Sequence, residues 1–264
     1  MRNIIEVSHL TKRFGDLTAV DDISFAVKEG ERFAFLGPNG AGKTTTINML
    51  TTLLTPTTGD IHLNGYDPRG EQTEVRRSFG IVFQDQSLDD ELTAFENMEF
   101  HGVLYRIPRD VRRTRIKELL EIVELWSRKE TRVKHFSGGM KRRLEIARGL
   151  LHHPKILFLD EPTLGLDPQT RNHIWNYIVN LNQAEKITIF FTTHYMEEAD
   201  RVAQSIAIID HGKIAMQGTP RALKNQTKAK SLEEAFIKLT GHTIRDEEAS
   251  GTDRMRMSRR MWRR

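Results

Sequence analysis

The sequence contains no cysteine and no long apolar run. Without cysteine the chain can form neither disulfides nor thiolate metal sites. A membrane-spanning helix needs roughly 20 apolar residues, whereas the longest apolar runs, 156–159, 187–191 and 206–209, have the length of strands. Residues 1–10 lack the apolar region of a signal peptide and are expected to form a strand. These absences agree with a cytoplasmic protein.

Excess positive charge is small and gathered at one end of the chain. The net charge is +4, and the last eleven residues contain six arginines and no acidic residue. Because the rest of the chain is close to neutral, we expect no nucleic-acid partner. Residues 241–264 are expected to form a flexible basic tail. That tail is either solvated or in weak contact with anionic lipid, to which its methionines and Trp262 would add.

Apolar segments of strand length alternate with helical patterns along most of the chain. Buried strands separated by helices predict a parallel sheet covered on both faces. The block at about 85–153 is instead helical, with Ile116 and Leu119 on one apolar face and Leu144 and Ala147 on another. We expect it to be an insertion in an α/β core, within a domain spanning residues 1–240. The predicted strands are 4–7, 23–27, 32–36, 60–63, 80–83, 156–159, 187–192 and 205–209, with 213–217 pairing as a hairpin. Helices are predicted to about residue 54, at 168–182, after Tyr195, and at 231–239.

The most specific motif is a glycine-rich loop between a predicted strand and a predicted helix. Residues 37–44 fit the pattern G-x4-G-K-[ST]. Glycines let the backbone wrap closely around phosphate, and the helix N-terminus favours the anion. Lys43 would reach the β- and γ-phosphates of ATP, and the Thr44 hydroxyl would coordinate Mg²⁺. The residues predicted to bind nucleotide here are Gly37, Pro38, Asn39, Gly40, Ala41, Gly42, Lys43, Thr44 and Thr45.

Two carboxylates end a buried strand later in the chain. Asp160 and Glu161 follow the apolar run 156–159, and ligands in α/β folds bind at the carboxyl ends of strands. Asp160 would hold the metal directly or through water. Glu161 would polarise the water that attacks the γ-phosphate.

Another potential anion site lies in the helical block. Ser137 can cap a helix that begins with Gly138 and Gly139, leaving backbone amides open to an anion. Further on, His152 and His153 follow a helical segment. We expect them to sit at a helix C-terminus, where positive charge is favourable, rather than to bind metal.

These motifs, in this order, resemble those of the ATP-binding subunits of ABC transporters over about residues 4–239. Residues 136–140 look like the family signature, with Phe136 and Met140 where leucine and glutamine are common. Residues 83–93 and 232–241 resemble the daunorubicin-resistance-like branch of ABC-2 type exporters. The resemblance implies a P-loop NTPase core with a mainly parallel sheet, an antiparallel β subdomain and an inserted helical subdomain.

The resemblance also implies roles for single residues. Gln84 matches the glutamine that senses metal and water near the membrane partner, and His194 matches the switch histidine that contacts the γ-phosphate. Asp167 falls in the loop that crosses the dimer interface, and Phe14 matches the aromatic that stacks on adenine. Ser137, Gly138 and Gly139 would face the γ-phosphate held by a second copy.

The function expected from the resemblance is ATP hydrolysis by a homodimer that drives a separate membrane permease. The permease would dock in a groove near Gln84, which places the chain at the cytoplasmic face of the membrane. A soluble ABC ATPase of translation or DNA repair is an alternative, although such proteins typically carry two cassettes or a long coiled-coil insertion. A small-molecule kinase would explain the loop at 37–45, but neither residues 137–139 nor His194.

Overall fold

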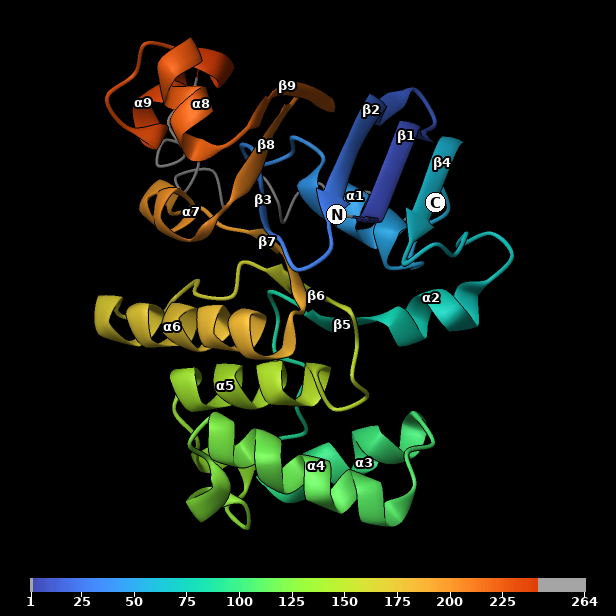
Figure 1. The fold of residues 1–264 in the computed structure, drawn as a ribbon, viewed down its shortest axis with the longest axis vertical. Coiled ribbons are helices and arrows are strands. Elements are labelled where there is room, and N and C mark those ends of the chain that lie inside the picture. Colours follow the sequence, from blue (N-terminus) through green and yellow to red (C-terminus); the bar gives the residue numbers. More distant parts are fainter. Residues whose placement is uncertain (1, 242–264) are drawn as a thin grey trace.

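The computed structural model describes residues 2–241 and contains two sheets (Figure 1). The larger sheet has the strand order β5 (Phe79–Val82), β6 (Ile156–Asp160), β7 (Thr188–Thr192), β3 (Arg32–Leu36), β8 (Ser205–Asp210) and β9 (Lys213–Gly218). Its first five strands are parallel, and β9 pairs antiparallel with β8. The predicted parallel sheet and the predicted hairpin are therefore confirmed.

The smaller sheet is antiparallel, with the order β2 (Leu17–Lys28), β1 (Asn3–Phe14) and β4 (Thr58–Leu63). The strands predicted at 4–7 and 23–27 are correct in place but too short. Pairing continues past the polar residues because the ladder shifts register there, with His9 and Asp22 in the left-handed region at φ 51° and 53°. Such irregularities let a strand bend without ending.

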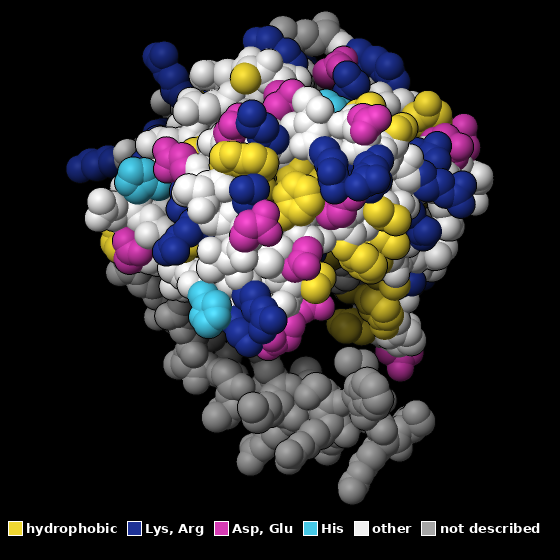
Figure 2. All heavy atoms as spheres, turned by 90° about the horizontal axis from the view of Figure 1, so that it is seen from below, with side chains coloured by type: hydrophobic (Ala, Val, Ile, Leu, Met, Phe, Trp, Pro, Cys, Tyr) yellow, Lys and Arg dark blue, Asp and Glu magenta, His cyan; other side chains and the backbone are white. Residues whose placement is uncertain are grey.

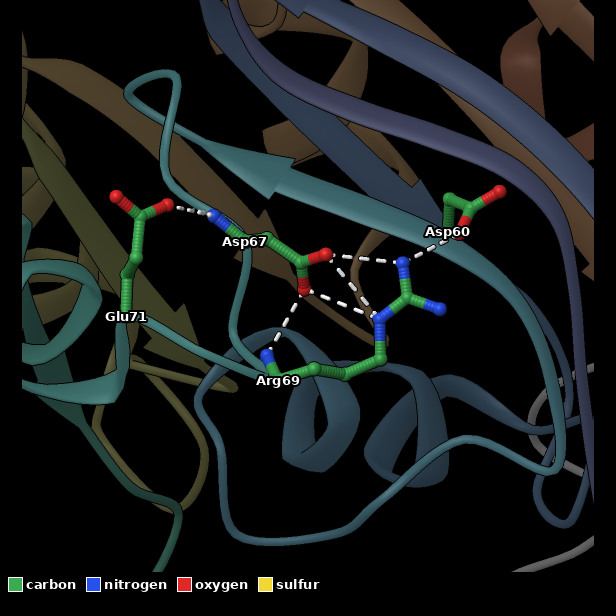
Figure 3. Close-up of polar contacts among 4 residues, drawn as sticks. All are labelled: Asp60, Asp67, Arg69 and Glu71. Atoms are coloured by element: carbon green, nitrogen blue, oxygen red, sulfur yellow. Dashed lines mark hydrogen bonds and ion pairs between the residues drawn. The ribbon is translucent and has the colours of Figure 1, made fainter.

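A network of charged side chains closes the turn between β4 and α2 (Gln72–Ser78), a helix that the sequence analysis did not predict. Arg69 pairs with Asp60 at 2.6 Å and with Asp67 at 2.9 Å, while the Asp67 amide donates to Glu71 (Figure 3). These groups are largely exposed, so the network shapes the loop more than it stabilises the fold.

The helical block lies between β5 and β6 in the sequence and gathers at one end of the molecule, the lower end in Figure 1. It comprises α3 (Ala94–Leu104), α4 (Arg109–Ile122), two short 3₁₀ turns (Trp126–Arg128 and Val133–His135) and α5 (Gly138–Gly149). The predicted apolar faces of α4 and α5 are buried, with Ile116, Leu119, Leu144 and Ala147 all at 0% exposure. Helix α6 (Pro168–Glu185) packs alongside α5.

Apolar layers cover both faces of the larger sheet. Along β6, Leu157 and Leu159 face the helical side, whereas Ile156 and Phe158 face the antiparallel sheet and α1 (Lys43–Leu50). Because both faces are covered, the strand is apolar at every position before Asp160.

Three short helices complete the described chain: α7 (Met196–Val202), α8 (Pro220–Gln226) and α9 (Leu232–Thr240). The amphipathic helix predicted near the C-terminus is α9, which buries Leu232 and Phe236. The helix α8 was not predicted, although Thr219 caps it and Pro220 occupies its first turn. In residues 2–241 no helix is long and apolar enough to cross a membrane. The predicted basic tail, apart from Gly241, lies outside the described residues.

Candidate active site

The glycine-rich loop joins β3 to α1 in a conformation that larger residues could not adopt. A Cβ on Gly37 would lie 2.3 Å from a backbone oxygen of β8, and one on Gly42 would lie 2.6 Å from a backbone oxygen of β2. Gly42 has φ 110° and begins α1 without a side-chain cap. Lys43 is buried, and its Nζ donates to the carbonyl oxygens of Gly37 and Pro38 at 2.6 and 2.9 Å. The loop is thus held as a tight cradle around an open helix start.

Helix α1 is shorter than the helix predicted to about residue 54. It ends at Leu50, and Thr52 adopts φ 62°. The amides of Leu53 and Leu54 then donate to the Asn48 carbonyl.

A hollow of about 280 Å³ opens beside this loop and brings together residues that are distant in the sequence. Its lining residues are Asn39, Gly40, Gly42, Lys43, Thr44, Thr45, Gln84, Glu161 and His194. Thr44 is exposed there, so its hydroxyl is accessible. Most predicted loop residues therefore meet Gln84, Glu161 and His194 at one site.

The carboxyl end of β6 carries a buried acidic pair. The Thr192 hydroxyl donates to Asp160 Oδ1 at 2.6 Å and accepts from the Glu161 amide at 3.0 Å. Burial raises the pKa of Asp160, and the Thr192 hydrogen bond opposes that effect; the Glu161 charge raises it further and the Lys43 charge lowers it. The charges of Lys43 and Glu161 therefore both act on the pKa of Asp160.

Glu161 and His194 are in direct contact in the hollow. His194 Nε2 lies 2.6 Å from Glu161 Oε1. Glu161 Oε2 and His194 Nδ1 are buried and have no hydrogen-bond partner within residues 2–241. Glu161 also adopts the left-handed conformation at φ 51°. Strain and unpaired polar atoms of this kind are typical of functional sites.

The start of α5 lies outside this hollow. Ser137 caps α5, as predicted, by accepting from the Met140 amide at 3.3 Å. Gly139 lies so close to Thr170 of α6 that a Cβ would meet its Cγ2 at 2.6 Å. Asp167 caps α6 by accepting from the Gln169 and Thr170 amides. The two helix starts are therefore packed together, and Ser137 is exposed.

The sequence profile of the ABC transporter family matches residues 20–164, more than half of the chain. The chain belongs to the ABC transporter family. It is 42% identical over 216 residues to the linearmycin resistance ATP-binding protein LnrL of Bacillus subtilis (strain 168), covering 82% of this chain and 69% of that protein. It is 38% identical over 267 residues to the daunorubicin resistance ATP-binding protein DrrA3 of Streptomyces coeruleorubidus, covering 95% of this chain and 84% of that protein.

A solved structure agrees with this assignment. The dimeric post-hydrolysis state of the ATP-binding cassette MJ0796, bound to ADP and Pi, is 30% identical with a TM-score of 0.72, covering 81% of this chain and 98% of that one. The protein is therefore an ATP-binding, ATP-hydrolysing subunit of an ABC transporter. The fold class implied by the resemblance is confirmed.

The predicted adenine-stacking residue of this ABC ATPase is not part of the hollow. Phe14 ends β1, is 47% exposed, and lies under Lys12, whose Nζ is 5.0 Å from the ring centroid. It is open to a ligand approaching from solvent, and its stacking role stays a prediction.

The expectation of positive charge on the double histidine is wrong for His152. Burial lowers the pKa of His152 to about 4, so its imidazole is neutral at neutral pH. Its Nε2 donates to the Phe79 carbonyl at 2.9 Å, and its ring stacks on Tyr105 at 3.9 Å. Within residues 2–241, no group of three or more His, Asp or Glu residues could hold a metal ion.

Several polar residues that order the site were missed by sequence analysis. Arg142 of α5 donates to the carbonyl oxygens of Phe83 and Gln84 and pairs with Glu145 at 3.0 Å, so α5 is tied to the segment that carries Gln84. Glu145 in turn accepts from the Ser87 amide at 2.8 Å. The only hint in the sequence was that Arg142 and Glu145 lie three residues apart within a predicted helical segment.

Proposed function

We propose that two copies of this ATPase enclose two ATP molecules. Each ATP would lie between the glycine-rich loop of one copy and residues 137–139 of the other. The supporting observation is the separation of Ser137 from the hollow that contains Lys43, Glu161 and His194. An exposed, capped helix start is suited to an anion from outside the chain.

Within each site, the contacts support a separate role for each residue. Lys43 neutralises phosphate charge, and the amides of the loop fix its position. Glu161 polarises the attacking water, and His194, at 2.6 Å from it, holds that carboxylate in place and contacts the γ-phosphate. Gln84 would report on the metal and the water.

The oxygen donors beside the loop fit Mg²⁺. Thr44 offers a hydroxyl, Gln84 an amide oxygen and Asp160 a carboxylate, which are the hard ligands that this ion prefers. When bound, Mg²⁺ neutralises charge on the phosphates. Because burial raises the pKa of Asp160, a cation there would also stabilise its ionised form.

We place the membrane partner on the α3 side of the molecule. Phe100, Val103 and Leu104 of α3 are between 52% and 63% exposed. Phe100 and Leu104 line a hollow of about 300 Å³ together with Ser87, close in sequence to Gln84. Figure 2, viewed from the side of α3 and α4, shows hydrophobic side chains gathered on one part of this face. Exposed apolar patches are typical of protein interfaces.

The transported cargo would be a drug or another hydrophobic compound, leaving through a separately encoded permease. The names of the relatives, which include linearmycin and daunorubicin resistance proteins, support export. Through the permease the chain would lie at the cytoplasmic face of the membrane, with a weak lipid contact from the arginines of 254–264. A reading frame for a six-helix membrane protein beside this one would support the assignment, and co-purification with its product would test it.

Two variants test the proposed site. Glu161→Gln should bind ATP and remain an ATP-bound dimer, detected by size-exclusion chromatography with MgATP. Lys43→Ala should lose ATP affinity by calorimetry. A Glu161→Gln protein that stays monomeric with ATP would contradict the enclosed-ATP arrangement, and full ATP affinity in Lys43→Ala would contradict the phosphate assignment.

A further inference from the structure

Glu198, in the first turn of α7, is a buried carboxylate with neutral partners. It is 7% exposed. The Thr163 hydroxyl donates to its Oε1 and Oε2 at 3.0 and 2.9 Å, and the Thr193 hydroxyl donates to Oε2 at 2.8 Å. Arg171 and Arg201 line a hollow together with Glu198. Their contacts are with other residues: Arg201 donates to Asn172 at 2.6 Å, and Arg171 lies over the Tyr195 ring at 4.0 Å.

Stability does not explain a charged group at this position. Burying a carboxylate without a cationic partner is costly, even when hydroxyl groups donate to it. An acidic residue near a helix start is favourable, but the exposed neighbour Glu197 already provides that charge. A residue that opposes stability in this way is expected where function requires it.

The two threonines belong to two loops of the proposed site. The loop after β6 carries Glu161, and the loop after β7 carries His194. Thr163 lies two residues after Glu161, and Thr193 directly precedes His194. The Thr193 hydroxyl also accepts from the Tyr195 amide at 3.1 Å, so the backbone is held on both sides of His194. Glu161, with φ 51°, needs such restraint because its backbone conformation is unfavourable.

We propose that Glu198 is a positioning residue for ATP hydrolysis, an inference that rests on the proposed roles of Glu161 and His194. Through the Thr163 and Thr193 hydroxyls it joins the loop after β6 to the loop after β7. It thereby keeps Glu161 Oε1 and His194 Nε2 at 2.6 Å. Glu198 does not line the hollow beside the glycine-rich loop, so it acts through these two residues.

Glu198→Gln tests this role most directly. Glutamine keeps the size but replaces one acceptor oxygen with an amide nitrogen and removes the negative charge, so the hydrogen bonds from the Thr163 and Thr193 hydroxyls become weaker. Small misplacements of reacting groups cost up to about 100-fold in rate, and we expect kcat for ATP hydrolysis to fall by about tenfold or more. KM for ATP should stay within about twofold, because the cradle around Lys43 is untouched. Glu197→Gln, an exposed carboxylate in the same turn, is the matched control and should keep both values.

Hydroxyl variants give a second test that does not depend on the carboxylate. Thr163→Val and Thr193→Val should lower kcat, whereas Thr163→Ser and Thr193→Ser, which keep the hydroxyl, should restore it. In a His194→Ala background, Glu198→Gln should cost much less than in the native chain, because groups that act as a unit are not additive.

The outcomes separate the two proposals. Native kcat in both Glu161→Gln and His194→Ala would contradict the proposed function. Loss of kcat in those two variants, with kcat unchanged in Glu198→Gln or equal in the valine and serine variants, would overturn only the positioning role. A Glu198→Gln protein with lower thermal stability and unchanged kcat would likewise show that the residue is merely structural. If Glu198→Gln does not fold, comparing kcat between the valine and serine variants of Thr163 and Thr193 tests the positioning role instead.

Discussion

Asp160→Asn should stabilise this ATPase while removing its activity. Asp160 is 7% exposed, and one described side chain, Thr192, donates to it at 2.6 Å. Asparagine has nearly the same shape and keeps a carbonyl oxygen for that hydrogen bond. It removes a charge that burial and the neighbouring Glu161 both disfavour. The substitution therefore removes the energetic cost of a buried charge from the folded state.

The expected gain is about 0.5–2 kcal/mol in the free energy of unfolding, typical of substitutions that relieve functional conflicts. For a chain of this size that gain corresponds to a rise of about 1–8 °C in Tm. The gain should depend on pH in a defined direction. Because the folded-state pKa of Asp160 is raised above 3.8, the native chain carries the cost of the charge above that raised pKa. The advantage of asparagine is full at neutral pH and disappears as the pH falls toward 3.8.

Thermal melting of both proteins without nucleotide or divalent metal, at neutral and mildly acidic pH, measures this difference. Steady-state ATPase assays with Mg²⁺ measure the loss of activity. A lower Tm for Asp160→Asn at neutral pH, or a Tm difference that grows on acidification, would refute the argument from burial. Retained Mg²⁺-dependent ATPase activity would refute the metal role of Asp160.

Three further outcomes follow from the same structure. Gly42→Ala should lose about 1–3 kcal/mol of stability and much of its ATP affinity, because its φ of 110° and the nearby β2 carbonyl both oppose a Cβ; Gly15→Ala, with φ 56° and open space, should lose less in thermal melting. Ser137→Ala should cost about 1 kcal/mol in chemical denaturation through the lost helix cap and should weaken ATP-dependent dimerisation. Burial lowers the pKa values of His101 and His152 to about 4 from 6.5, so the unfolded chain binds protons that the native chain does not. Stability should therefore fall between about pH 6.5 and 4 in pH-dependent denaturation, and His152→Gln should reduce that fall.

The sequence predicted the parts of the fold that repeat a simple local rule. Strand β6 is apolar from Ile156 to Leu159 because both of its faces are covered, and the length of this apolar run and its flanks identified it. The glycine-rich loop could be identified from the sequence because only glycine fits the close backbone approaches at positions 37 and 42. Helices α2 and α8 were missed because each has seven residues with little apolar periodicity.

The polar contacts that order the site could not be read from the sequence. Thr192 reaches Asp160 because β6 and β7 pair in a register that places these two residues side by side. Glu198 reaches Thr163 across 35 positions of sequence. Such partners depend on strand order and register, which are properties of the whole sheet. A threonine or glutamate with no local hydrogen-bond pattern gives no sign of them.

A mixing experiment tests the composite site most directly. In any homodimer of a Lys43→Ala copy or of a Ser137→Arg copy, both sites would lack one essential half. In a mixed dimer, the intact loop of the second copy faces the intact helix start of the first, and one complete site is restored. We predict little ATPase activity from either variant alone and measurable activity on mixing them. No recovery from two folded variants that form mixed dimers, or native activity from Ser137→Arg alone, would contradict a site shared between two copies.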